Sequence, residues 1–113
     1  MSKLDEKIAS YKAMVAKNNL GISDDFLTKV TKGLGPSIYK KDAESVSCAQ
    51  KSEKELVVNN FLKKKLGLTD DDATLLKAVD EVCEKMGKSN PQKFRAVFYA
   101  LLAMKFKKES IYA

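Results

Sequence analysis

Residues 91–107 read PQKFRAVFYALLAMKFK and include the longest uncharged apolar run of this 113-residue chain. Asn90 favours a helix N-cap and Pro91 suits the first helical position, so we expect a helix that reaches about Lys107. A helix without a polar side is usually buried on several sides, which predicts that the other helices pack around this one. Its apolar positions are Phe94, Val97, Phe98, Leu101 and Met104 on the main face, Tyr99, Leu102 and Phe106 beside it, and Ala96, Ala100 and Ala103 on the remaining side.

A six-residue pattern occurs twice, as LGISDD at 20–25 and as LGLTDD at 66–71. Gly ends helices in the left-handed conformation, and Ser or Thr caps the helix that follows. The paired Asp residues place negative charge at the positive N-terminus of that helix. Both copies therefore predict that one helix stops and another begins.

Apolar spacing predicts the remaining helices. They are a helix over about 4–19 that ends at Gly21, a short helix after Ser23 that stops within 33–36, a turn at 36–39, a helix from Ser52 to about Leu66, and one from about Thr69 to Gly87. Ser52 and Glu55 match a capping box. The pattern of this helix is imperfect, because Lys65 falls on its apolar side and Leu56 falls opposite. No segment alternates with a period of two, so we expect no sheet.

Length and composition bound the fold. A chain of 113 residues that is 44% hydrophobic and 32% charged is long enough to bury one core. We therefore predict a single all-α domain over residues 1–113, an irregular array of about five main helices plus short helical turns, with the helix near 91–107 buried at its centre.

The formal net charge of +6 comes almost entirely from Lys, since a single Arg is present. Arg is the preferred side chain for bidentate binding of phosphates and guanine edges, so this composition first indicates solubility. The charge is also uneven, because residues 70–90 sum to −3 (three Lys, six acids) and residues 91–113 to +4 (five bases, one Glu). We expect adjacent helices from these two regions to neutralise each other in part.

The chain contains no His, which removes the commonest general base, the usual nucleophile pairs and the imidazole metal sites. The acids are explained by helix caps, and the turn at Gly33–Ser37 is better explained as a helix stop than as an anion site. We therefore predict no catalytic residue, no cofactor site and no metal site. Cys48 and Cys83 form no C-x-x-C pair, which favours a reducing cytoplasm, with Cys83 inert in the core and Cys48 the only candidate reactive thiol.

Lysines and tyrosines supply the candidate binding residues. Lys63, Lys64 and Lys65 are either a basic patch for phosphate backbones or a solvated helix face, and the solvated face is favoured. The same patch would include Lys40, Lys41, Lys51 and Lys54. Tyr39 and Tyr112 each end a Ser-Ile-Tyr triplet and are either exposed recognition aromatics or packed rings with a wet hydroxyl. The candidate surface is Tyr39, Lys40, Lys41, Lys63, Lys64, Lys65, Arg95 and Tyr112. A pocket that joins Tyr39, Tyr112, Arg95 and Lys65 would favour binding, and their mutual burial would indicate a structural role.

Several separated segments carry a resemblance. They are Val30–Lys32, Gly35–Tyr39, Asp42–Ala43, Asn60–Leu62, Lys64–Leu68, Gly87–Asn90, Arg95–Val97 and Lys108–Tyr112. Together they resemble a small bacterial family, domain of unknown function 2853, over nearly the whole chain. The resemblance implies a short bacterial, cytoplasmic protein, and it supplies no activity, cofactor or catalytic residue.

We therefore predict a non-enzymatic binding or interaction module whose partner is unknown, either a protein or a polyanion. One alternative is weak, non-specific nucleic-acid binding through the Lys of residues 40–65 and the last helix. The other is self-association through the Ala face or an apolar patch at Tyr99 and Phe106. We expect a monomer or weak homo-oligomer. The acidic N-terminal residues and the short apolar runs predict neither export nor membrane insertion.

Overall fold

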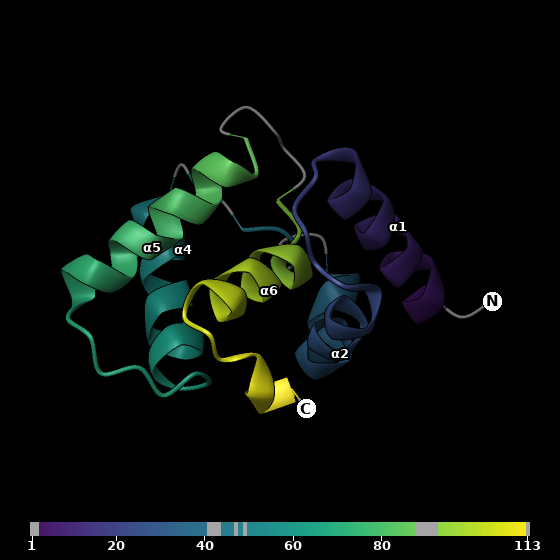
Figure 1. Ribbon diagram of the computed structural model, residues 1–113. Coiled ribbons are helices and arrows are strands. Elements are labelled where there is room, and N and C mark those ends of the chain that lie inside the picture. The colour runs from purple at the N-terminus through teal and green to yellow at the C-terminus, as the bar shows by residue number, and fades with distance from the viewer. Residues whose placement is uncertain (1–2, 41–43, 47, 49, 88–92, 113) are drawn as a thin grey trace.

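The computed structural model describes residues 3–40, 44–46, 48, 50–87 and 93–112 (Figure 1). Over these residues the fold is all-helical, as predicted. The elements are α1 (Lys3–Lys17), α2 (Asp24–Leu34), the 3-10 helix η1 (Gly35–Tyr39), α4 (Lys51–Val57), the π-helix η2 (Val58–Lys63), α5 (Asp72–Lys85), α6 (Arg95–Lys105) and the 3-10 helix η3 (Glu109–Tyr112). Extended pairing in the described residues is limited to one isolated bridge, between Ser45 and Phe94. No helix among them is long and apolar enough to cross a membrane.

Helix α6 is the centre of the molecule, as its sequence predicts. In Figure 1 it lies between α1 and α2 on one side and α4 and α5 on the other. Each residue from Ala96 to Ala103 is buried, and Val97, Phe98 and Leu102 are fully excluded from solvent. Because apolar side chains surround α6, every neighbouring helix can bury its own apolar face against it.

The predicted start of this helix is wrong. Asn90 and Pro91 lie outside the described residues, and α6 begins four positions later, at Arg95. Phe94 is extended (φ −57°, ψ 132°) and pairs with Ser45. The neighbouring Val46 N–H donates to the carbonyl of Lys93 at 2.8 Å. Long-range backbone pairing therefore competes successfully with the helical preference of the first turn.

The two repeated joints share their glycines but differ in their caps. Gly21 and Gly67 both have positive φ, at 71° and 68°, as expected for helix stops. In the first joint the Ser23 side chain accepts a hydrogen bond from the Phe26 N–H, as predicted. In the second joint the cap is Asp71, which accepts from the Thr74 N–H, so the prediction that Thr69 caps this helix is wrong.

The predicted capping box at Ser52 is also wrong, because α4 begins at Lys51 and its N-cap residue, Gln50, makes no side-chain capping bond. Ser52 therefore lies inside the first turn. Glu53 is used in a tertiary contact, since its carboxylate accepts a hydrogen bond from Arg95 at 2.6 Å.

The π-helix η2 explains the imperfect apolar pattern of this region. In a π-helix each N–H bonds to the carbonyl five residues earlier, so a turn holds more residues than in an α-helix. A wheel drawn at 100° per residue cannot describe such a segment. Leu66 is consequently buried while Lys65 points to solvent, and Leu56, which precedes η2, remains 52% exposed.

Cys48 and Cys83 form a disulfide, and this corrects the prediction made for both residues. Cys83 lies on the buried face of α5, and Cys48 is partly buried in the segment before α4. Neither is a free thiol, so Cys48 is not a candidate reactive cysteine. The bond also removes the observation that favoured a reducing compartment, because disulfides persist mainly in oxidising surroundings. Two cysteines 35 residues apart carry no sequence signal that distinguishes a bonded pair from two separate thiols.

Candidate functional site

The eight residues of the predicted candidate surface do not converge on one pocket. Lys41 lies outside the described residues. Arg95, at the start of α6, is half-buried against α4. Tyr39 and Lys40 lie at the end of η1, beside α1. The remaining four, Lys63, Lys64, Lys65 and Tyr112, lie on η2, on the loop that follows it and on η3. Tyr39 borders a hollow on α1, Arg95 contacts Glu53 and Tyr99, and Lys65 lies against Tyr112, so these four residues do not converge in the arrangement that would favour a binding pocket.

Arg95 has a structural role. Its guanidinium donates to Glu53 at 2.6 Å and to the Tyr99 hydroxyl at 2.7 Å, and the Tyr99 ring stacks on Phe61 with centroids 3.9 Å apart. Burial raises the pKa of the Tyr99 hydroxyl. Because the guanidinium and the Glu53 carboxylate satisfy one another away from solvent, this group ties α4 and η2 to α6 and offers little to a ligand.

Tyr39 borders a shallow hollow on α1, of about 420 Å³, with Lys3, Glu6, Lys7 and Ser10. Behind it the Glu44 carboxylate accepts hydrogen bonds from Lys7 and from the Tyr11 hydroxyl, both at 2.7 Å. Burial and this carboxylate raise the pKa of Tyr11 well above its ordinary value. Glu44 is thus committed to holding its segment on α1 and is a poor candidate for a general base.

Tyr112 is the meeting point of three elements. Its ring meets Phe26 of α2 edge-on at 5.7 Å between centroids, and the Lys65 ammonium lies 5.4 Å from its centre. Gly33 of α2 permits this approach, because a Cβ there would lie 3.2 Å from the ring. The predicted packed arrangement of Tyr112, with its ring in contact, is the one found.

Five lysines lie on the segments that converge on Tyr112, and we call them the lysine surface. They are Lys32 of α2, Lys64 and Lys65 after η2, and Lys107 and Lys108 between α6 and η3. None of the five makes an ion pair with a described residue. The acid in this terminal segment is Glu109, so the surface carries a local excess of positive charge.

Lysines elsewhere on the helices are frequently neutralised. Lys54 pairs with Asp80 at 2.8 Å, and Lys63 pairs with Asp72, both between the α4–η2 segment and α5. Lys105 of α6 pairs with Glu81 of α5. The Lys105–Glu81 pair is the expected neutralisation between residues 70–90 and 91–113. The acids in these three pairs are therefore not available to neutralise the lysine surface.

Burial raises the pKa of the Tyr112 hydroxyl to about 12. An unfolded tyrosine ionises near pH 10, so folding is favoured by the neutral hydroxyl, and this stabilisation is complete below pH 10 and is lost as the pH rises toward 12. We expect the free energy of unfolding to fall between pH 10 and 12, and to fall less in Tyr112→Phe, which cannot ionise. Urea denaturation at pH 9 and 11 measures this, and an equal fall in both proteins would contradict it.

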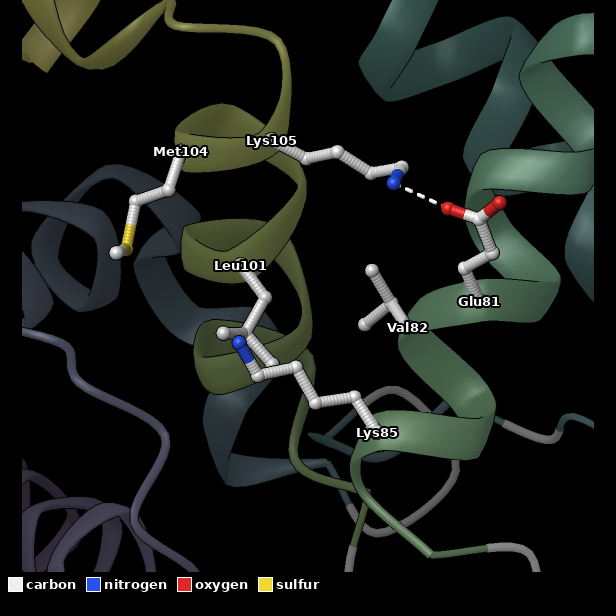
Figure 2. Close-up of a pocket in the computed structure, with 6 residues that line it drawn as sticks. All are labelled: Glu81, Val82, Lys85, Leu101, Met104 and Lys105. Atoms are coloured by element: carbon white, nitrogen blue, oxygen red, sulfur yellow. Dashed lines mark ion pairs between the residues drawn. The ribbon is translucent and has the colours of Figure 1, made fainter.

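A second surface, which the sequence did not indicate, is the groove between α5 and α6. Its volume is about 420 Å³, and its lining residues are Glu81, Val82, Lys85, Leu101, Met104 and Lys105. Figure 2 shows Val82 and Leu101 between the two helices, with the Lys105–Glu81 ion pair crossing at one end and Lys85 extending toward α6 at the other. The ion pair and hydrogen bond from Lys105 lower the pKa of Glu81, which keeps this carboxylate ionised.

The Ala face of α6 is not available for self-association. Ala96, Ala100 and Ala103 are at most 1% exposed, because α6 is enclosed within the chain. Tyr99 is also buried and Phe106 is partly buried against the core, so the apolar patch proposed there is largely internal. No group of three His, Cys, Asp or Glu among the described side chains is arranged to hold a metal ion.

The lysine surface was predicted only in part. Lys64, Lys65 and Tyr112 belong to the candidate surface, while Lys32, Lys107 and Lys108 were missed. The excess of +4 over residues 91–113 was a usable signal for the last two. No comparable signal points to Lys32, which joins the others only because α2 packs against η3.

Residues 10–110 match the model of a family described as a protein of unknown function (DUF2853). No curated protein matches the chain. Since the family match spans nearly the whole chain, the chain belongs to this family, and the predicted resemblance is confirmed.

Proposed function

We propose that this member of the DUF2853 family is a non-enzymatic binding module, and that its lysine surface binds the phosphate backbone of nucleic acids weakly and without sequence specificity. The observation that carries the proposal is the set of five lysines, on the segments that meet at Tyr112, that have no ion-pair partner among the described residues. Other lysines, such as Lys54, Lys63 and Lys105, are used in ion pairs within the molecule, whereas the unpaired lysines of this surface are available to a ligand.

The composition of this surface determines the kind of recognition. Lys ammonium groups are compact, flexible point charges, and they contact phosphates without reading base edges. The single Arg is committed to Glu53 and Tyr99, so it supplies no bidentate base contact. Binding through these lysines therefore depends on charge and releases counterions from the nucleic acid.

The test is fluorescence anisotropy with a labelled 20-base-pair DNA duplex at salt concentrations from 50 to 200 mM. If all five lysines neutralise phosphates, the slope of log affinity against log salt is about −4.5, and the affinity falls by about 500-fold over this range. A flat salt response, or no binding at 50 mM salt, would contradict the proposal.

The double substitution Lys64→Glu with Lys107→Glu should weaken binding at least tenfold and bring the slope closer to zero by about 2. The matched control is Lys3→Glu with Lys12→Glu on α1, because each pair lowers the net charge from +6 by four, to +2. Equal losses in the two variants would mean that net charge, and not this surface, governs binding.

A further inference from the structure

We propose that the groove between α5 and α6 docks a short acidic, amphipathic helix of a partner protein. The groove shares no residue with the lysine surface, so this inference does not depend on nucleic-acid binding.

The shape of the groove suits a helical partner. Val82 from α5 and Leu101 from α6 give it an apolar floor, and Met104 completes the lining from α6, with its side chain directed away from α5 in Figure 2. Apolar side chains along one face of a third helix can insert between two packed helices in the same way as in helix–helix packing. The hollow of about 420 Å³ admits a few such side chains.

The charges on the rim select the partner. Glu81 and Lys85 line the groove from α5 and Lys105 faces them from α6, while Lys77 lies just beyond the lining, one turn before Glu81 and on the same side of α5. Lys105 is paired with Glu81, whereas Lys77 and Lys85 make no ion pair with a described residue. The lining thus carries a net charge of +1, from two Lys and one Glu, and Lys77 beside it adds a further positive charge.

The distance between the two unpaired lysines sets the length of the contact. At a rise of 1.5 Å per residue, the eight positions from Lys77 to Lys85 cover about 12 Å, or roughly two helical turns. A partner helix with carboxylates two turns apart and apolar side chains between them can satisfy both lysines and the floor. A contact of this size is weak and transient, and its rim charges act mainly on the association rate.

The apolar floor of the groove favours a protein helix over a nucleic acid as its partner. Phosphates would gain nothing from Val82 and Leu101, and Glu81 would repel them. An acidic helix can place its carboxylates at Lys77 and Lys85, one helical turn to either side of Glu81, while its apolar face covers the floor.

The test is a nuclear magnetic resonance titration of the ¹⁵N-labelled full chain with an 18-residue helical peptide that carries Leu along one face and Glu on both flanks. We expect shifts at the amides of Val82, Leu101 and Met104. A control peptide with Lys in place of every Glu should bind at least tenfold more weakly. Equal binding of the two peptides, or shifts confined to the lysine surface, would overturn the proposal.

A charge-neutralised variant localises the effect. Lys77→Gln with Lys85→Gln should weaken binding of the acidic peptide at least fivefold, whereas the matched control Lys3→Gln with Lys12→Gln should leave it unchanged. Equal effects of the two variants would overturn the proposal. Lys64→Glu with Lys107→Glu should leave peptide binding within twofold, so that failure of the groove and failure of the lysine surface are separate results.

Discussion

Leu102→Ala is expected to lower the free energy of unfolding by about 2 to 5 kcal/mol. Leu102 lies on α6 and is fully buried in the core that all the main helices share. The substitution removes transfer free energy and leaves a cavity, because neighbours on several sides cannot all move inward. A loss of this size is a large part of the 5–15 kcal/mol typical of a folded domain.

Leu56→Ala provides a matched control, since it deletes the same atoms from a leucine that is 52% exposed. We expect it to change the free energy of unfolding by no more than about 0.5 kcal/mol. Urea denaturation followed by far-ultraviolet circular dichroism measures both values. Similar losses in the two variants would contradict the central position of α6.

Reduction of the Cys48–Cys83 disulfide is expected to destabilise the protein by about 4 kcal/mol. The two cysteines are 35 residues apart in the sequence, and the loop-closure entropy that their bond removes from the unfolded chain gives this figure. In the native state the bond anchors the segment around Cys48 to α5. The same segment carries Glu44, which binds α1, and Val46, which pairs with Lys93.

The measurement is urea denaturation with and without a phosphine reductant, beside the double variant Cys48→Ser with Cys83→Ser. We expect the reduced protein and the double variant to unfold at the same lower urea concentration, and the reductant to leave the double variant unchanged. An unfolding midpoint that does not respond to reduction would show that the bond contributes nothing to stability, and a thiol titration of the untreated protein that finds two free thiols would contradict the bond itself.

The parts of the fold that sequence predicted are those fixed by local preference. Gly21 and Gly67 stop helices because a left-handed residue suits glycine, and Ser23 caps α2 because its hydroxyl reaches the Phe26 amide three residues on. The burial of α6 follows from its composition alone, since no face of this helix is polar enough to favour exposure to water.

The predictions are wrong where a residue makes a long-range tertiary contact in place of the local helical interaction that its sequence position suggests. Glu53 pairs with Arg95 and Phe94 pairs with Ser45, and both partners are about 40 or more residues distant in the sequence. The widened turn of η2 likewise has no signature in a helical pattern that assumes 3.6 residues per turn.

The candidate surfaces show the same division. Lys64, Lys65 and Tyr112 were recognisable from residue type, but no periodicity relates Lys32 to Lys107, and only the packing of η3 on α2 brings their segments together. The α5–α6 groove was invisible to the sequence, because its floor and rim come from two helices whose relative position the chain does not encode locally.

The sequence by itself determined that this chain is helical, where most of its helices stop, and which helix is buried, because capping, glycine conformation and apolar periodicity act over a few residues. The tertiary structure alone decided that Cys48 meets Cys83, which lysines form ion pairs with acids, and which stay unpaired on the segments that meet at Tyr112. These outcomes depend on distances between residues far apart in the chain, and such distances exist only once the helices have packed.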